Sequence, residues 1–266
     1  MKLFDRIIEL KVGDTNIKGL DIAFEIEKDE SPEPNPCHID IFNLNPTNRT
    51  ILAKYQKVPV LLKAGFKDGV GVIFHGDMMR CNNSFEQASW KTTLACGEGL
   101  KESQKNPVNK TFAKGTPLKT VINELTGQIE ICSGDSAGLI AQIDGDLTRS
   151  YSISGNPYHE VKRILASKNL LLSIQNNLLQ IRAKTKALSK SAISLSADTG
   201  LLSSPEINSK HQITVRALLM ADYQPGRLIY LDTKVFRGHL IIKKVNFNGA
   251  NFGDNWEAKM ECEVIS

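Results

Sequence analysis

The stretch that decides the fold is residues 37–96, CHIDIFNLNPTNRTILAKYQKVPVLLKAGFKDGVGVIFHGDMMRCNNSFEQASWKTTLAC. It begins with alternation: Ile39 and Ile41 face one way and polar residues face the other, as in a strand with one buried face. Asn45 and Pro46 then predict a helix N-terminus, because asparagine caps helices and proline suits the first helical position. This stretch contains no pattern typical of a nucleophile, a base or a set of metal ligands. The order of its predicted strands and helix is therefore what indicates the fold.

The second half of this stretch predicts a hairpin followed by another strand. Residues 58–66 place an apolar side chain at every second position, which is typical of a strand. Residues 67–69, Lys-Asp-Gly, predict a turn into a strand over 72–79. The alternation of Trp90, Thr92, Leu94 and Cys96 predicts a further strand with these four residues on one face.

Segments along nearly the whole chain resemble the baseplate hub proteins of contractile-tailed bacteriophages. In chain order they are IDIFNLNPTNR, VLLKAGFKDGVGVIFHGDM, FAKGTPLKTVINEL, LSADTGLLSSPE, VRALLMADYQPGRLIYLD and GDNWEAKMECEV. The resemblance implies a structural virion protein: a homotrimer on the tail axis that adapts a hexameric tail tube to a trimeric central spike. It further implies a role in starting tube assembly, and two tail-tube-like β-domains of barrel or sandwich form in each subunit.

The same resemblance implies the partners and the location. The expected partners are the tail tube protein, the central spike protein and other baseplate proteins, with DNA only as cargo passing through the channel. The expected location is the tail baseplate of the virion, assembled in the host bacterial cytoplasm. Two other functions stay open. One is the hub of a phage-derived bacteriocin or contractile injection system, and the other is a tail enzyme or module that degrades or binds cell wall.

Composition describes an ordinary globular protein without a nucleic-acid-binding signature. Hydrophobic residues make up 41% and charged residues 23% of the 266 residues, and the net charge is +4. This small excess of basic over acidic residues is spread evenly along the chain. It argues against nucleic-acid binding, because proteins that bind nucleic acids usually carry a concentrated basic patch. The densest basic run, residues 184–190, is interpreted as a solvated linker. No apolar run approaches the roughly 20 residues that span a bilayer, so no membrane partner is expected.

Changes of period divide the sequence into three segments: a tube-like β-domain at 1–108, an α+β module at 109–183 and a second tube-like β-domain at 184–266. In the middle segment, Thr116 is predicted to cap a helix that Pro117 opens, and Asn156 to cap another. Residues 170–182 predict a hairpin that turns at Asn176 and Asn177.

The last segment contains the clearest strand, 256–264, in which Trp256, Met260 and Val264 share an apolar face. Its expected neighbours are segments 212–219, 227–233 and 239–247. Near the N-terminus, residues 20–26 predict a strand, and the acidic, proline-rich residues 27–36 predict a loop.

Four residue pairs are candidates for chemical sites: His38 with Asp40, His75 with Asp77, Asp144 with Asp146, and Glu98 with Glu102. The His–Asp pairs suit a polar strand face, the Asp-Gly-Asp turn lacks the further ligands of a calcium loop, and the glutamates suit an exposed helical face. Gly69 and Gly71 lack the lysine of a phosphate-binding loop. The five cysteines form no CxxC pair, and Cys96 and Cys262 fit apolar strand faces. The prediction is a protein that is not an enzyme, with no catalytic residue, no metal site and no cofactor.

Overall fold

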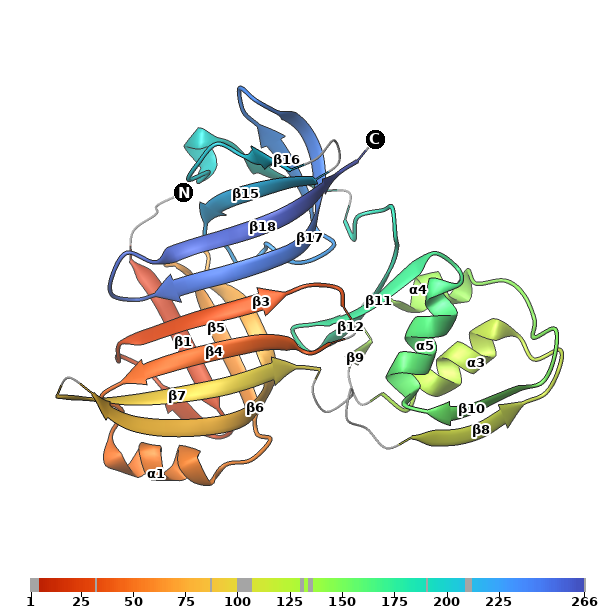
Figure 1. Ribbon diagram of the computed structural model, residues 1–266, viewed down its shortest axis with the longest axis horizontal. Helices are drawn as coiled ribbons and strands as arrows, with labels where there is room; N and C mark the ends of the chain where they lie inside the picture. Colours follow the sequence, from red (N-terminus) through yellow and green to blue (C-terminus); the bar gives the residue numbers. More distant parts are fainter. Residues whose placement is uncertain are drawn as a thin grey trace. The chain divides into compact units, whose positions relative to one another are not determined.

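Strands, most of them antiparallel, are the main secondary structure of the described residues, which confirms the predicted mainly β fold with a helix-containing insert. The computed structural model describes residues 5–31, 33–86, 88–99, 107–129, 132–133, 136–189, 191–208 and 212–265 (Figure 1). The chain divides into two units. Unit 1 contains Met1–Asp29, Asn35–Glu98 and Ala187–Ser266, and unit 2 contains Glu30–Pro34 and Gly99–Lys186.

Unit 1 is built on one sheet of 13 strands. Its main path, in spatial order, is β14 (Glu206–Ile207), β15 (Gln212–Leu218), β18 (Trp256–Val264), β17 (Arg237–Ala250), β3 (Ile22–Lys28), β4 (Asn35–Phe42), β7 (Ser89–Glu98), β6 (Gly71–Glu86), β5 (Pro59–Phe66), β1 (Arg6–Val12) and β2 (Thr15–Ile17). Off this path, β16 (Leu228–Asp232) pairs with β17, and β13 (Ile193–Leu195) pairs with β16 in parallel.

The pairing of β17 with β3 joins the C-terminal strands to the N-terminal ones. It runs from Val245 opposite Lys28 to Ala250 opposite Ala23. The two strand-rich segments therefore lie side by side in one sheet. Of the three neighbours expected for β18, β15 and β17 are confirmed, but β16 does not pair with it. The edge of the long strand β17 that faces away from β18 is shared by β16 and β3.

Local sequence signals place the short helix of unit 1 correctly. Helix α1 (Pro46–Lys54) begins after Asn45, whose side-chain oxygen accepts a hydrogen bond from the backbone N–H of Asn48 at 2.8 Å. Leu52 is fully buried, and Tyr55 packs against the core. The helix thus buries one side, and tertiary packing stabilises it.

The core of unit 1 is formed by the inward faces of strands from both ends of the chain. Trp256 packs edge-on against Phe24 and Phe66, with ring centroids 6.2 and 5.9 Å apart. On β18, Trp256 and Met260 are buried as predicted, while Val264 is half-buried. Burying these large side chains removes apolar area from water, which is the main driving force for folding.

Unit 2 has its own hydrophobic core and a mixed α+β composition. Its elements are β8 (Val108–Phe112), α3 (Leu118–Thr126), β9 (Cys132–Ser133), α4 (Ser136–Ala141), β10 (Tyr151–Gly155), α5 (Pro157–Ala166), β11 (Leu170–Gln175) and β12 (Leu178–Ala183). The Asn156 cap and the hairpin turn are confirmed. Asn156 accepts from the N–H groups of Tyr158 and His159, and Asn176 and Asn177 have φ values of 52° and 59°. Two positive φ values match the turn type that twists with its flanking strands.

Two local predictions are wrong. Thr116 does not cap α3, because Pro117 is the cap residue with extended backbone and the Thr116 hydroxyl donates to the carbonyl of Ala113 at 2.8 Å. The acidic loop is also shorter than expected, since β3 continues to Lys28 and β4 begins at Asn35. Pro36 is tolerated because it lies beyond the last β3–β4 pair, Ile26 with Cys37.

Candidate functional surfaces

The His–Asp pairs do not form chemical sites. Asp40, on the outer face of β4, accepts from the Thr93 hydroxyl at 2.7 Å and pairs with Lys91 at 2.9 Å. On β6, Asp77 is buried while His75 is half-buried. Within the described ranges, no cluster of three or more His, Cys, Asp or Glu side chains is arranged to hold a metal ion.

The turns at residues 69–71 and 144–146, which were candidate ligand loops from the sequence, have structural roles in the fold. Gly69 donates its N–H to the carbonyl of Phe66 at 2.7 Å, and its own carbonyl lies 2.2 Å from where a Cβ on Gly65 would stand. This close backbone contact explains the need for glycine at position 65. Gly145 adopts φ 113°, and its carbonyl accepts from Leu118 N–H at 2.9 Å, which links the turn to the start of α3.

Glu98 was predicted on an exposed helical face, and that prediction is wrong. It ends strand β7 and is 1% exposed. Its Oε1 lies 3.2 Å from Nζ of Lys28, and its Oε2 accepts from the side-chain amide of Asn35 at 2.7 Å. Asn35 in turn accepts from the N–H of Asp29 at 3.0 Å. Glu102 lies outside the described residues.

This cluster is structural in character because it is closed to solvent. Burial lowers the pKa of the Lys28 amine, and the nearby Glu98 carboxylate opposes that shift. A carboxylate engaged by an ammonium and an amide inside the core has no access to an external substrate. Its geometry ties together the ends of β3 and β7 and the start of β4.

The described cysteines of unit 1 are free thiols, and three of them are buried: Cys37, Cys96 and Cys262. Burial raises the pKa of Cys96 to about 12 and also raises the pKa of Cys37 and Cys262. Nucleophilic and metal-binding cysteines need the thiolate form. The predicted packing role of Cys96 and Cys262 is therefore confirmed.

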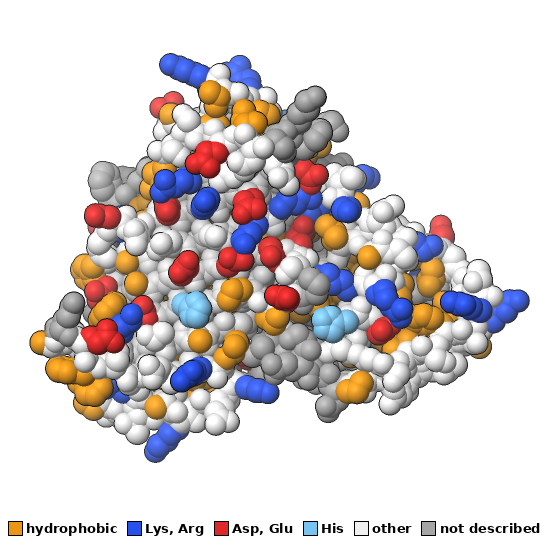
Figure 2. Space-filling view, in the orientation of Figure 1, with side chains coloured by type: hydrophobic (Ala, Val, Ile, Leu, Met, Phe, Trp, Pro, Cys, Tyr) orange, Lys and Arg blue, Asp and Glu red, His pale blue; other side chains and the backbone are white. Residues whose placement is uncertain are grey.

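The outer face of the sheet carries both signs of charge. We call the solvent-facing side of β15, β18, β17, β3, β4 and β7 the mosaic face. Its ion pairs are Lys244 with Glu27 at 2.5 Å, Lys243 with Glu263 at 2.6 Å, Arg216 with Glu257 at 2.6 Å and Lys91 with Asp40 at 2.9 Å. Figure 2 shows acidic and basic side chains interspersed on unit 1, with no large area of one sign in this view. Such partly exposed pairs add little stability each, so their main effect is to keep the face polar and nearly neutral.

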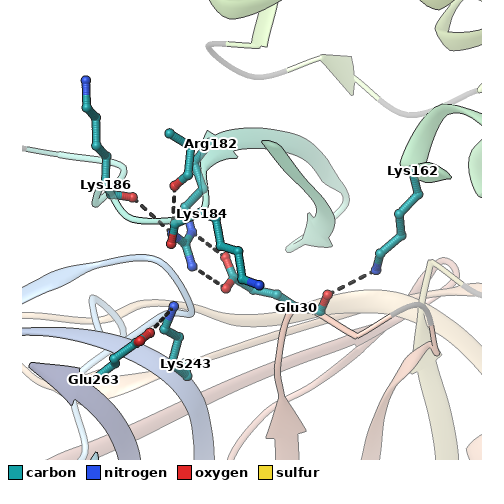
Figure 3. A network of polar contacts seen from close by, with 8 residues as sticks. Glu30, Lys162, Arg182, Lys184, Lys186, Lys243 and Glu263 are labelled. Carbon is teal, nitrogen blue, oxygen red and sulfur yellow. Dashed lines mark hydrogen bonds and ion pairs between the residues drawn. The ribbon is translucent and has the colours of Figure 1, made fainter. Parts of the chain in front are cut away.

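Unit 2 contains a clamp centred on Arg182, which is buried (Figure 3). Its guanidinium forms a two-pronged ion pair with Glu30 and donates to the carbonyls of Ala183, Lys184 and Lys186 at 3.0 Å each. The Nζ atom of Lys162 donates to the Glu30 carbonyl at 3.0 Å. The start of the basic run, interpreted from sequence as a solvated linker, is thus held through its backbone while its side chains are exposed.

Two features at the ends of the unit 1 sheet were missed by sequence reasoning. The first is an exposed aromatic pair at the end of the β6–β7 hairpin, where Phe85 and Trp90 have ring centroids 5.4 Å apart. The second is a groove of about 670 Å³ between residues 196–204 and the β16–β17 turn. Trp90 was predicted on the same face as Leu94, but it is 39% exposed because β7 extends there past its neighbour β4.

The sequence profile of the family described as "Baseplate hub gp41" matches residues 7–262. The chain belongs to this baseplate hub family. It is therefore a structural component of a bacteriophage tail, as the resemblance of its segments indicated. No curated protein sequence matches it.

Solved structures show where this hub fold occurs elsewhere. A 43 kDa tail protein of prophage MuSo2 from Shewanella oneidensis superposes with a TM-score of 0.67 at 8% identity, over 97% of this chain and 98% of that one. A tail protein from Neisseria meningitidis MC58 gives 0.66 at 9% identity, over 98% and 97%. The Escherichia coli c3393 protein, a type VI secretion system component, gives 0.64 at 10% identity, over 97% and 77%. At sequence identities of 8–10%, the similarity to these three proteins shows a shared fold.

Within the described part of the chain, no helix is both long and apolar enough to cross a membrane.

Proposed function

We propose that three copies of this hub form a ring that adapts a hexameric tail tube to a trimeric central spike and helps to initiate tube assembly. The observation that carries the proposal is the β3–β17 pairing, which unites two strand-rich segments of one chain in a single sheet. If each segment acts as one tube-like domain, three chains offer six similar edges to the tube. The same three chains offer three identical sites to the spike.

In this role the partners are the tube protein, the spike protein and other baseplate proteins, and DNA is only cargo in the channel. Assembly takes place in the host cytoplasm. The protein acts as a scaffold and not as an enzyme. Support for this part comes from the engagement of the candidate groups in the fold, Glu98 with Lys28 and Asp40 with Lys91.

The fold shared with a type VI secretion component favours a second candidate, the hub of a contractile injection system or phage-derived bacteriocin. Both candidates make the same physical demands on the chain. The presence or absence of capsid and terminase genes beside this gene separates them.

The test is the mass of the purified protein, followed by particle imaging alone and after mixing with the neighbouring tube protein. A three-fold ring that caps hexameric tubes is the expected result. A stable monomer in every condition, together with normal tails from a strain that lacks the gene, would overturn the hub proposal. Purified murein incubated with the protein should show no loss of turbidity, and lysis above a buffer control would overturn the non-enzymatic role.

A further inference from the structure

Three buried polar side chains lie side by side on the neighbouring strands β3, β4 and β7 (Figure 1). Asn35, at the start of β4, is the register partner of Glu98, at the end of β7. On the other side of β4, the last register pair with β3 is Ile26 with Cys37, and two residues further along each strand Lys28 comes opposite Asn35. Alternate residues of a strand share a face, so Lys28 and Asn35 project inward like the buried pair before them.

The carboxylate of Glu98 connects the other two side chains. Its Oε1 lies 3.2 Å from Nζ of Lys28, and its Oε2 accepts a hydrogen bond from Nδ2 of Asn35 at 2.7 Å. The side chains of Lys28 and Glu98 have no exposed surface, and Asn35 is 5% exposed. An amine and a carboxamide are therefore held against one carboxyl group at a place closed to solvent. Such fixed proximity greatly raises the rate of reaction between two groups.

A backbone group engages the carbonyl of the carboxamide. The N–H of Asp29 donates to Oδ1 of Asn35 at 3.0 Å. A donor at this position polarises the carbonyl and stabilises the negative charge that develops on its oxygen when a nucleophile adds to the carbon. The Asn35 side chain thus has an oxyanion donor on its oxygen and a carboxyl group on its nitrogen.

The surroundings of Lys28 favour the neutral amine, which is the nucleophilic form. Burial lowers the pKa of this amine, although the Glu98 carboxylate opposes the shift. Moving one proton from Nζ to the carboxylate beside it converts two buried charges into a neutral amine and a carboxylic acid. Neutral groups cost less than ions in an apolar interior.

We propose that Lys28 and Asn35 join in an intramolecular amide bond, with Glu98 as the acid–base catalyst. The lone pair of Nζ forms a bond to Cγ of Asn35, and the carbonyl electron pair moves onto Oδ1, where the Asp29 N–H stabilises it. Glu98 gives its proton to Nδ2 and takes one from Nζ. The carbonyl then re-forms as the Cγ–Nδ2 bond breaks, and ammonia leaves with the proton held by Glu98, as ammonium.

The reaction balances without an oxidant or a reductant. One side-chain ammonium and one carboxamide become one secondary amide and one ammonium ion, and the Glu98 carboxylate is restored. Each chain reacts once with itself, so this inference goes beyond the hub role and needs no external substrate. The product closes a ring over residues 28–35 and joins β3 to β4 covalently, at the point where the chain passes through residues 30–34 of unit 2.

The residue after Asn35 removes the common competing reaction. Asparagine usually loses ammonia when the backbone nitrogen of the next residue attacks its side chain. Pro36 has no backbone N–H, so it cannot form this cyclic imide. Loss of ammonia at Asn35 therefore reports attack by a different nitrogen.

The first experiment is mass spectrometry of the intact, folded, full-length protein. The natural sequence should weigh about 17 Da less than the mass of its amino acids, because one ammonia is lost. Glu98→Gln and Lys28→Met should each keep the full mass of their own sequences. The matched control is Lys91→Met, because Lys91 also pairs with a carboxylate, Asp40, but lies outside the cluster. This control should show the same loss as the natural sequence, and circular dichroism verifies that each variant is folded.

The second experiment locates the bond by tryptic digestion. Trypsin cleaves after lysine only when the side-chain amine is free. The natural sequence should therefore give a single peptide of residues 19–49 that lacks one ammonia, in place of separate peptides 19–28 and 29–49. Glu98→Gln should give the two separate peptides.

A time course tests whether the fold drives the reaction and does not depend on any variant. Protein from cell-free synthesis that is kept in urea should retain its full mass. Transfer into folding buffer should start the loss of ammonia at a rate independent of protein concentration, because the reacting groups belong to one chain and meet only when it is folded.

The outcomes decide the proposal. A folded natural sequence that keeps its full mass, with cleavage after Lys28, overturns it. A loss of ammonia that maps to another asparagine, or that proceeds at the same rate in Lys28→Met or in urea, overturns it too. An undiminished rate in Glu98→Gln removes Glu98 from the reaction. The hub proposal does not depend on this bond and stands in each case.

Discussion

The Nζ atom of Lys28 lies 3.2 Å from Oε1 of Glu98, with both side chains fully buried in unit 1. Lys28 ends β3, Glu98 ends β7, and Asn35, which begins β4, donates to the same carboxylate. At each of these strand ends the chain leaves or re-enters unit 1, since unit 2 takes up Glu30–Pro34 and continues from Gly99. The buried pair therefore fixes the strand ends from which the insert departs.

Glu98→Gln should destabilise the protein by about 3 kcal/mol or more, because it leaves the buried Lys28 ammonium without that negative charge. Urea unfolding at pH 7 measures the loss. The control is Glu257→Gln, which breaks a partly exposed pair with Arg216 and should cost less than about 1 kcal/mol. Adding Lys28→Met to Glu98→Gln removes the buried ammonium as well and should recover most of the loss. Equal costs for the two single variants would contradict the structural role of the pair.

Alkaline pH should destabilise unit 1 through its buried thiols. Burial raises the folded-state pKa of Cys96 from 9.0 to about 12, so the unfolded state releases this proton first as pH rises. The stability that this thiol contributes is fully present below pH 9 and is lost as pH rises toward 12. The loss approaches 1.4 kcal/mol per pH unit within that window.

Cys96→Ala isolates this effect. The variant should be less stable at neutral pH because it leaves a small cavity. Its unfolding free energy should nevertheless fall less steeply between pH 9 and 11 than that of the natural sequence, measured by urea unfolding under reducing conditions. Parallel pH profiles would show that Cys96 does not titrate with unfolding.

Arg182→Lys should loosen the connections at the edge of unit 2. Lysine keeps the charge but cannot form the two-pronged pair with Glu30 while donating to three carbonyls. Amide hydrogen exchange should accelerate at least tenfold over residues 183–186. Arg163→Lys is the matched control, since Arg163 is 65% exposed and pairs with Glu160 at 2.6 Å. Unchanged exchange in the Arg182 variant would show that the clamp does not order this segment.

Local signals in the sequence were sufficient where one element decides its own structure. The Asn45 and Asn156 caps, the Asn176–Asn177 turn and the alternation of β18 each depend on a few neighbouring residues. Thr116 failed as a cap because Pro117 has extended backbone, so the helix begins one residue later than predicted. The side-chain type predicts which residues can be the N-cap, but the backbone conformation determines which residue occupies that position.

Long-range pairing explains the remaining errors. Glu98 and Lys28 are separated by 70 positions, and the sequence around each residue does not predict that its side chain is buried. The acidic composition of residues 27–36 predicted a loop, yet Lys28 belongs to β3 because it pairs with Val245 of β17, which is distant in sequence. Similarly, the exposure of Trp90 depends on where the separate strand β4 stops pairing. Features of this kind need the assembled sheet before they can be recognised.

The face assignment of β18 gives a sharp contrast between adjacent residues. Met260 is fully buried, and Glu261 is exposed opposite Lys244. Met260→Asp should abolish soluble expression or lower the unfolding free energy by several kcal/mol, because it buries an unpaired carboxylate. Glu261→Lys should change it by less than about 0.5 kcal/mol. If the two variants show the same solubility and thermal midpoint, the assignment of faces is wrong.

The balanced charge of the mosaic face predicts weak contact with DNA. Lys and Arg there are countered by neighbouring carboxylates, such as Glu27 beside Lys244, so few cations are available to displace counterions from phosphates. The natural sequence should give no measurable binding of labelled duplex DNA by fluorescence anisotropy at 150 mM salt and micromolar protein, where non-specific binders have dissociation constants of about 10⁻⁴–10⁻⁶ M.

Reversing Glu25, Glu261 and Glu263 to lysine removes three negative charges from this face and adds three positive ones. This variant should bind DNA, and the binding should weaken steeply with salt, by up to about 0.9 log units per log unit of salt for each new phosphate contact. The control makes the same change at Glu9, Asp14 and Asp68, which lie outside the mosaic face. It should bind at least tenfold more weakly, because its new cations are scattered. Equal affinities would show that net charge, and not the arrangement of charge on this sheet, governs contact with DNA.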